Sequence, residues 1–155
     1  RGLGDVYKRQ RAMGRVSKGV RGMRLTEAHK VISMVIPEEG GFLLTVCENG
    51  FGKRTVVTEF PTKGRGGKGM IAIQASDRNG PLVGATQLFS GDEIMLISDQ
   101  GTMVRTRGDE VSAVGRNTQG VRIIRLKENE NLVSLARIAE PQENEDSDSV
   151  KTMDE

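Results

Sequence analysis

A short loop of glycines and cations is the first feature of this sequence with residues suited to chemistry. Residues 62–73 read TKGRGGKGMIAI, in which Lys63, Arg65 and Lys68 alternate with glycines before an apolar run begins. Glycine lets a backbone approach an anion closely, and consecutive N–H groups bind phosphate oxygens. The loop therefore suits a nucleotide or a nucleic acid, or it forms an ordinary solvated turn.

The residues around this loop exclude two nucleotide-binding motifs. GRGGKG fits the pattern G-x-G-x-x-G, but a dinucleotide fold needs a helix after the glycines, and the alternating run MIAIQAS predicts a strand. A P-loop needs a glycine where Thr62 stands and a serine or threonine where Gly69 stands. A nucleic-acid site and a plain turn remain.

The loop belongs to a repeat. Three segments begin Gly-Arg, have glycine at the sixth position and continue into an alternating apolar run, at offsets of 50 and 51 residues. They are GRVSKGVRGMRL (14–25), GRGGKGMIAIQA (64–75) and GRNTQGVRIIRL (115–126). Residues 42–60 align with 93–111 at an offset of 51, and a third family comprises residues 30–36, 81–87 and 131–137. One structural unit therefore recurs about every 50 residues.

Each unit is predicted to consist of short strands. Asn49-Gly50 lies between two β-rich runs, which is a strong hairpin signal because both residues tolerate positive φ, and Gln100-Gly101 lies in the equivalent setting. Glycines recur every few residues, which argues against helix. The sequence therefore predicts an all-β fold, about two and a half propeller-like blades of four short strands each. Five structural glycines are expected at equivalent turns: Gly19, Gly50, Gly69, Gly101 and Gly120.

The cations recur with the repeat, so a ring of blades would gather them on one basic rim. Such a rim attracts a long polyanion through phosphate contacts and counterion release. No aromatic residue lies among these cations, which argues against stacking of single-stranded bases and favours duplex DNA. The predicted DNA-binding residues are Arg15, Lys18, Arg21, Arg24, Lys53, Arg54, Lys63, Arg65, Lys68, Arg105, Arg107, Arg116 and Arg122.

Charge divides the chain of 155 residues into parts. Residues 11–140 hold 19 Lys or Arg against 14 Asp or Glu, whereas residues 141–155 hold one Lys and six Asp or Glu. We expect the latter to form a disordered acidic tail, which either aids solubility or competes with an anionic ligand. Residues 1–10 do not resemble the repeat and are interpreted as a linker or a foreign stretch.

Other residue types narrow the possible functions. Cys47 is the sole cysteine, so no internal disulfide can form, which fits a reducing cytoplasm. No apolar run has the length of a membrane span, and no secretory segment is recognisable. His29 stands alone, without the spacing of a metal site. The acidic pairs at Glu38-Glu39 and Asp92-Glu93 have no nearby nucleophile and are expected in solvated turns.

Several stretches resemble the C-terminal domain family of DNA gyrase A. They are GVRGMRL, NGFGKRTVVTEFPTKGRGGKG, GTMVRTR and VGRNTQGVRIIRL, and the resemblance covers about residues 11–140. It implies that these residues are the C-terminal blades of a six-bladed β-pinwheel. Such a domain wraps duplex DNA around a basic perimeter without sequence specificity, which supports ATP-dependent negative supercoiling by a bacterial, cytoplasmic type II topoisomerase. An acidic tail is also usual in this family.

The resemblance further implies partners, cofactors and a division of labour. The partners are duplex DNA and gyrase B in an A2B2 heterotetramer, with no membrane. ATP and Mg²⁺ belong to other domains or to gyrase B, so no cofactor and no metal is expected here. The family's glycine-rich box reads Gln-Arg-Arg-Gly-Gly-Lys-Gly, and residues 63–69 share its last five residues as a degenerate copy. Tyr7 lies in DVYKRQ, which does not match the setting of the family's DNA-cleaving tyrosine, so we expect no catalytic residue and no activity from this fragment alone.

Two alternatives remain open from the sequence. The first is the corresponding domain of topoisomerase IV, and the second is a protein-binding propeller without a role on DNA.

Overall fold

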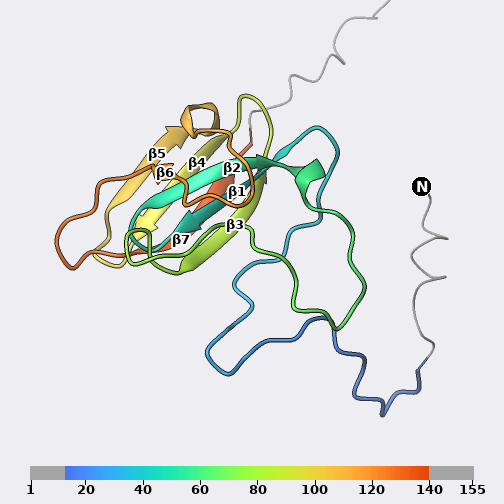
Figure 1. Ribbon diagram of the computed structural model, residues 1–155. Coiled ribbons are helices and arrows are strands. Elements are labelled where there is room, and N and C mark those ends of the chain that lie inside the picture. The colour runs from blue at the N-terminus through green and yellow to red at the C-terminus, as the bar shows by residue number, and fades with distance from the viewer. Residues whose placement is uncertain (1–12, 140–155) are drawn as a thin grey trace, which may run out of the picture. The chain divides into compact units, whose positions relative to one another are not determined.

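The computed structural model describes residues 13–139, which are coloured in Figure 1. They form two compact units, the first built from residues 13–30 and 62–70 and the second from residues 31–61 and 71–139. All named elements are strands or short 3-10 helices, so the predicted all-β class is confirmed. The expected linker at 1–10 and the expected acidic tail at 141–155 lie outside the described residues.

The first sheet of the second unit has four strands in the order β3-β1-β2-β6. Its strands are β1 (Phe42–Cys47), β2 (Phe51–Val56), β3 (Leu82–Leu88) and β6 (Val121–Arg122). The second sheet has three strands in the order β5-β4-β7. Its strands are β4 (Glu93–Ser98), β5 (Met103–Arg107) and β7 (Leu132–Ile138). All neighbouring strands pair antiparallel.

The two sheets repeat the same hairpin register. Phe42 pairs with Val56 in the first hairpin, and Glu93 pairs with Arg107 in the second, 51 residues later. Each central strand also carries one register shift against its other neighbour, between Val46 and Cys47 in β1 and between Ile97 and Ser98 in β4. A 3-10 turn follows each hairpin, η1 (Val57–Glu59) and η2 (Gly108–Glu110). The sequence repeat is therefore a repeat of backbone structure.

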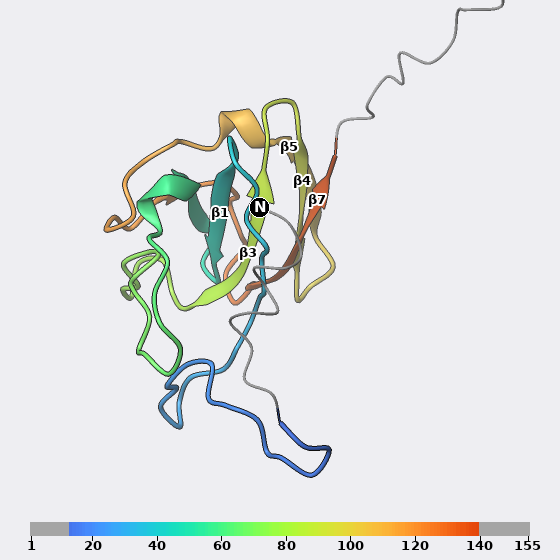
Figure 2. The same ribbon diagram turned by 90° about the vertical axis from the view of Figure 1, so that its right-hand side faces the viewer.

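A shared apolar core joins the two sheets. Leu44, Val46 and Leu88 come from the first sheet and Ile94, Leu96 and Leu132 from the second; all are fully buried. Burial of such a side chain contributes about 1.5–3 kcal/mol. Figure 2 shows β3 and β7 side by side where the sheets meet. Gly84 permits this approach, because a Cβ there would overlap the side chain of Leu135.

Strand β6 crosses from one repeat to the other. Its two residues lie after the hairpin of the second sheet in the sequence, yet they pair with Phe51 and Gly52 of β2 in the first sheet. The main chain of Arg54 continues this contact through an isolated bridge to Ala113. The first sheet thus receives its fourth strand from the following repeat (Figure 1).

Three expected strands are not strands in the structure. Residues 30–36, residues 70–76 and the run after Gly19 have no strand, apart from a bridge between Met23 and Gly67. In the two sheets, the equivalent segments are β3, β7 and β6, and each pairs with a hairpin of its own or the preceding repeat. The described residues contain no hairpin 51 residues before β1. The backbone groups of residues 30–36, of residues 70–76 and of the run after Gly19 therefore have no strand with which to form a ladder. Met34 and Ile36 are consequently 86% and 81% exposed.

Candidate nucleic-acid interface

The first unit brings two of the three glycine–cation loops together. Arg24 N donates to Gly67 O at 2.8 Å, and Gly66 N donates to Gly22 O at 2.8 Å, so segments about 44 residues apart in the sequence run side by side. Gly19 and Gly69 hold φ at +80° and +79° in the corresponding turns. The backbone therefore presents both loops on one small unit.

Seven of the predicted DNA-binding cations lie in this unit, and all are exposed. Within residues 13–30 and 62–70, the sole acidic residue is Glu27. None of the seven side chains forms an ion pair or hydrogen bond with another described residue. The seven are Arg15, Lys18, Arg21, Arg24, Lys63, Arg65 and Lys68. A dense set of exposed cations with one nearby carboxylate attracts phosphates, because no internal partner competes for the charges.

The third loop, residues 112–120, lies in the second unit and is held by residues of the preceding repeat. The carboxylate of Glu59 accepts a hydrogen bond from Arg116 N at 2.8 Å, and Gln74 Nε2 donates to Asn117 Oδ1 at 2.7 Å. The Arg116 guanidinium donates to Ile71 O at 2.7 Å and remains partly exposed. Gly120 has φ at +76°, as at the equivalent glycines of the first unit. This loop therefore has a fixed backbone that carries one cation.

Lys53 corrects the predicted set of DNA-binding residues. Its side chain is fully buried, and its ammonium donates to Gly115 O at 2.8 Å, to Arg116 O and to Thr118 Oγ1. Burial lowers the pKa of Lys53, an effect that the Glu59 carboxylate partly offsets. Lys53 cannot reach a phosphate from this position. Its partners lie more than 60 residues away in the sequence, so no local pattern indicated its burial.

Arg54 is a second predicted DNA-binding residue whose side chain is not free on the surface. Its guanidinium forms an ion pair with Asp109 at 2.8 Å, donates to Val111 O at 2.7 Å and lies 4.9 Å from the centroid of the Phe42 ring. The side chain is 11% exposed. Hydrogen bonds from Gly91 N–H and then from Arg54 lower the pKa of Asp109. Arg54 is therefore a structural residue whose charge is already paired.

Three other predicted cations lie on exposed parts of the second unit. Arg105 and Arg107 point from β5 and are exposed, although Arg105 pairs with the carboxylate of Glu93. Arg122 on β6 is exposed and lies 4.6 Å from the centroid of the Phe51 ring. These positions remain available to a polyanion.

Arg78 is an exposed cation that the sequence repeat does not predict. Its guanidinium carbon lies 4.7 Å from the centroid of the Phe51 ring, so Phe51 orients Arg78 and Arg122 together. The position equivalent to Arg78, 51 residues later, is Asn129. Because the cation does not recur, a search by repeat could not find it. The sequence feature that could have indicated this exposed cation is the turn motif Arg-Asn-Gly at residues 78–80.

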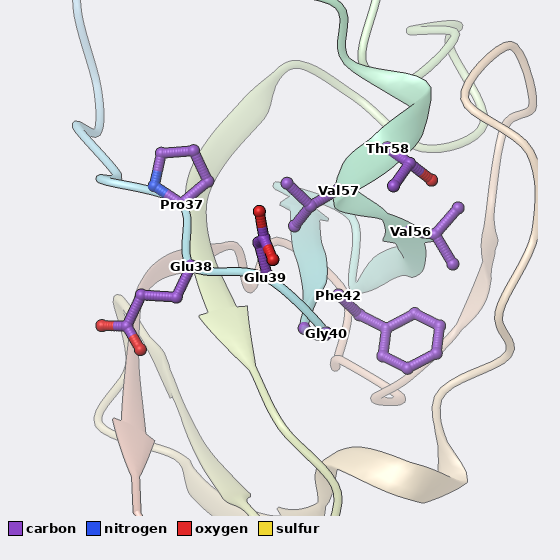
Figure 3. Close-up of a pocket in the computed structure, with 9 residues that line it drawn as sticks. Pro37, Glu38, Glu39, Gly40, Phe42, Val56, Val57 and Thr58 are labelled. Atoms are coloured by element: carbon purple, nitrogen blue, oxygen red, sulfur yellow. The ribbon is translucent and has the colours of Figure 1, made fainter. Parts of the chain in front are cut away.

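One pocket of the second unit does not suit phosphate. It has a volume of about 480 Å³ and is lined by Pro37, Glu38, Glu39, Gly40, Gly41, Phe42, Val56, Val57 and Thr58. Figure 3 shows the Glu39 carboxylate between Pro37 and Val57, with the Phe42 ring opposite. The lining includes two acidic residues, Glu38 and Glu39, and no cation, so it does not attract a polyanion.

Neither metal chemistry nor a reactive thiol is apparent in the part of the chain that the structure describes. No group of three or more His, Cys, Asp or Glu side chains there is arranged to hold a metal ion. Burial raises the pKa of Cys47 to about 11, against a smaller opposing effect of the nearby Lys53 charge. The thiol is therefore protonated at neutral pH. Within residues 13–139 no helix has the length and hydropathy needed to cross a membrane.

Repeated antiparallel blades, exchange of a strand between repeats and exposed glycine–cation loops define a propeller-type repeat domain with a basic surface. The family described as DNA gyrase C-terminal domain, beta-propeller matches residues 11–38, 41–87 and 92–139. The chain belongs to this family, and the resemblance inferred from the sequence is confirmed.

Curated relatives and solved structures agree with the family. The chain is 57% identical over 138 residues to the DNA gyrase A protein of Pseudomonas aeruginosa, covering 89% of this chain and 15% of that relative. It is 54% identical over 140 residues to the DNA gyrase A protein of Escherichia coli K12, covering 90% and 16%. The chain thus spans about one sixth of the length of these relatives.

Two solved structures share the fold. The structure of a DNA gyrase A C-terminal domain matches with a TM-score of 0.70 at 32% identity, covering 83% of this chain and 44% of that chain. The C-terminal domain of a DNA topoisomerase IV matches with a TM-score of 0.70 at 20% identity, covering 77% and 38%. The second likeness concerns the fold alone.

Proposed function

We propose that this chain is a DNA-wrapping part of a DNA gyrase A protein, which binds duplex DNA on its exposed cations without sequence specificity. The observation that carries the proposal is the first unit, where seven exposed cations on two adjacent glycine loops have one carboxylate among them. Membership of the gyrase C-terminal domain family supports the same ligand. Duplex DNA carries about one negative charge per 1.7 Å of helix axis, so several such cations engage it at once.

The longer protein supplies the chemistry in this proposal. The parent is an ATP-dependent type II DNA topoisomerase of the bacterial cytoplasm, which pairs with gyrase B. ATP and Mg²⁺ bind to other domains or to that partner. The part described here contributes positioning of DNA through phosphate contacts and no bond-making step.

The test is a salt titration of duplex binding by the full-length parent protein. Replacing both Arg65 and Lys68 with Ala removes up to two phosphate contacts from the first unit. The slope of log K against log salt should flatten by roughly 0.9 for each phosphate that the variant no longer neutralises, whatever the DNA sequence. Lys127→Ala is the matched control, because it removes an exposed cation that lies outside the glycine loops and the predicted set.

The outcome separates the two classes of function. A double variant with the wild-type salt slope would remove the first unit from the binding surface. Absence of salt-dependent duplex binding in the wild-type parent would favour a propeller that binds protein.

A further inference from the structure

The buried charge of Lys53 has no role in the proposed phosphate contacts. Its side chain has no exposed surface, and its three hydrogen-bond partners all lie in residues 115–118. Burying an ammonium costs free energy unless its donors are satisfied. A lysine at this position therefore serves the segment that it binds.

The ammonium has the geometry of a brace for the third glycine–cation loop. It donates to Gly115 O at 2.8 Å, to Arg116 O and to Thr118 Oγ1 at 3.2 Å, and Thr118 Oγ1 in turn donates to Gly115 O at 3.0 Å. Three partners match the three N–H groups of an ammonium. The loop backbone around Arg116 is thereby fixed on both sides of that residue.

The two residues that follow Lys53 bind the same part of the chain. Arg54 N donates to Ser112 O at 3.0 Å, and its carbonyl accepts from Val114 N at 2.9 Å. Thr55 Oγ1 donates to Val114 O at 2.9 Å. One short stretch of β2 therefore holds residues 112–118 along their length, and Lys53 holds the end that carries the cation.

The second repeat shows that the hairpin itself does not require a lysine. The residue 51 positions after Lys53 is Val104, which has the same place in the register of its hairpin and packs against the apolar core. Among the described residues, no loop faces Val104 as residues 115–118 face Lys53. A lysine therefore occupies this register position in the hairpin that a loop covers, and valine occupies it in the hairpin that has no such loop among the described residues.

We infer that Lys53 is a positioning residue: its ammonium holds residues 115–118 so that Arg116 lies where it can meet a duplex phosphate. Lys53 itself does not contact DNA. The part of this inference that concerns phosphate rests on the proposed function, whereas the brace is a property of the protein without DNA.

A double-mutant cycle in the full-length parent protein tests the inference. We compare Lys53→Met, which keeps most of the side-chain length and removes the charge, with Arg116→Ala, with the combination of both and with Lys53→Arg. Binding to a long duplex is measured at several salt concentrations, and a thermal melt reports the fold. Lys53→Met should lower affinity about tenfold at 0.1 M salt and flatten the salt slope by roughly 0.9, as Arg116→Ala does. The combined variant should bind no worse than either single variant, and Lys53→Arg should restore most of the affinity.

Hydrogen exchange of residues 112–120, measured without DNA, is the second arm. Lys53→Met should speed exchange at Arg116 N–H, and Thr118→Val, a milder change, should do so to a smaller extent. If Lys53→Met does not fold, Thr118→Val carries both arms, with Lys53→Arg as the control that keeps the positive charge. Additive losses in the cycle, or wild-type exchange in both Lys53→Met and Thr118→Val, would overturn the inference. If the wild-type parent lacks salt-dependent duplex binding, the proposed function fails while exchange still decides whether the brace exists.

Discussion

The two sheets of the second unit have the same backbone but different polar chemistry. The first repeat, β1 to β3, and the second, β4 to β7 without β6, share their hairpin registers and the position of the register shift. Apolar alternation and turn glycines determine these shared features, because they recur at equivalent positions in the sequence. The two repeats differ in the side chains that bind polar partners. The difference lies at the positions where a segment of the following repeat covers the sheet.

The clearest difference lies on the second strand of each hairpin. In β2, Lys53 and Thr55 donate to the backbone of residues 112–118. In β5, Thr106 Oγ1 donates to Glu110 of its own repeat at 3.0 Å, and Arg105 pairs with Glu93. Side chains of β2 thus bind the segment of the following repeat that lies beside this strand. Side chains of β5 bind residues of their own repeat, because the described residues place no such segment beside β5.

The largest expected effect compares two equivalent glycines. Gly50 and Gly101 both have positive φ, at +78° and +82°, but a Cβ at Gly50 would lie 2.6 Å from Ile124 O, whereas Gly101 has open space. Gly101→Ala should cost about 1–2 kcal/mol for the backbone conformation alone. Gly50→Ala should cost at least about 3 kcal/mol, because the following segment must also move. Urea unfolding of this chain measures both.

Equal losses for the two glycine variants would contradict this comparison. They would mean that residues 121–124 do not press against the first hairpin in solution.

The next effect compares two equivalent arginines. Arg54 is mostly buried and binds Asp109 and Val111 O, whereas the Arg105 side chain is 59% exposed and pairs with Glu93. Arg54→Ala should destabilise the chain by about 2–3 kcal/mol, since it leaves partners without a donor. Arg105→Ala should cost less than about 1 kcal/mol, as expected for an exposed ion pair. Thermal melts of both variants at moderate salt give the difference.

A loss at Arg105 as large as that at Arg54 would show that β5 is covered in solution. In duplex binding the order should reverse, with Arg105→Ala the more harmful change.

The smallest effect concerns pH. Asn79 and Glu130 lie 51 residues apart and cap equivalent turns, accepting from Ser76 N at 2.7 Å and from Lys127 N at 2.9 Å. Hydrogen bonds from Ser98 and Thr102 and from the Lys127 N–H lower the pKa of Glu130 to about 2. Because the folded-state pKa lies below the unfolded value, this stabilisation is present above about pH 4.5 and is lost as pH falls toward 2.

The measurement is the urea midpoint of wild type and Glu130→Gln at pH 7, 4 and 3. The wild type should lead at pH 7, and its lead should shrink at pH 4 and again at pH 3. Asn79→Ala is the control, because an amide does not titrate and its deficit should stay constant over the same range. A constant lead of the wild type over Glu130→Gln would exclude titration of this carboxylate.

Local patterns in the sequence determined the repeat and its elements. Offsets of 50 and 51 residues, turn glycines and alternating apolar residues predicted an all-β chain with hairpins at Asn49-Gly50 and Gln100-Gly101, and both hairpins are present. These features depend on residues close together in the chain, which is why they could be read without a structure. The same patterns over-predicted strands at 30–36 and 70–76, since a strand also needs a partner.

Tertiary structure alone decided which cations face solvent. Lys53 lies in the same Gly-Lys-Arg-Thr stretch that predicted a basic rim, yet loop carbonyls more than 60 residues away enclose its ammonium. Arg54 is likewise mostly buried, because its guanidinium pairs with Asp109. Arg78, in contrast, lies on the surface beside Arg122, and both guanidinium groups lie against the ring of Phe51. The charge of a side chain is a property of its type, but its availability depends on which distant segment the fold brings against it. These contacts form between repeats. Strand β6 and the loop that precedes it belong to the second repeat in sequence, but they pack against β2 and complete the sheet of the first repeat.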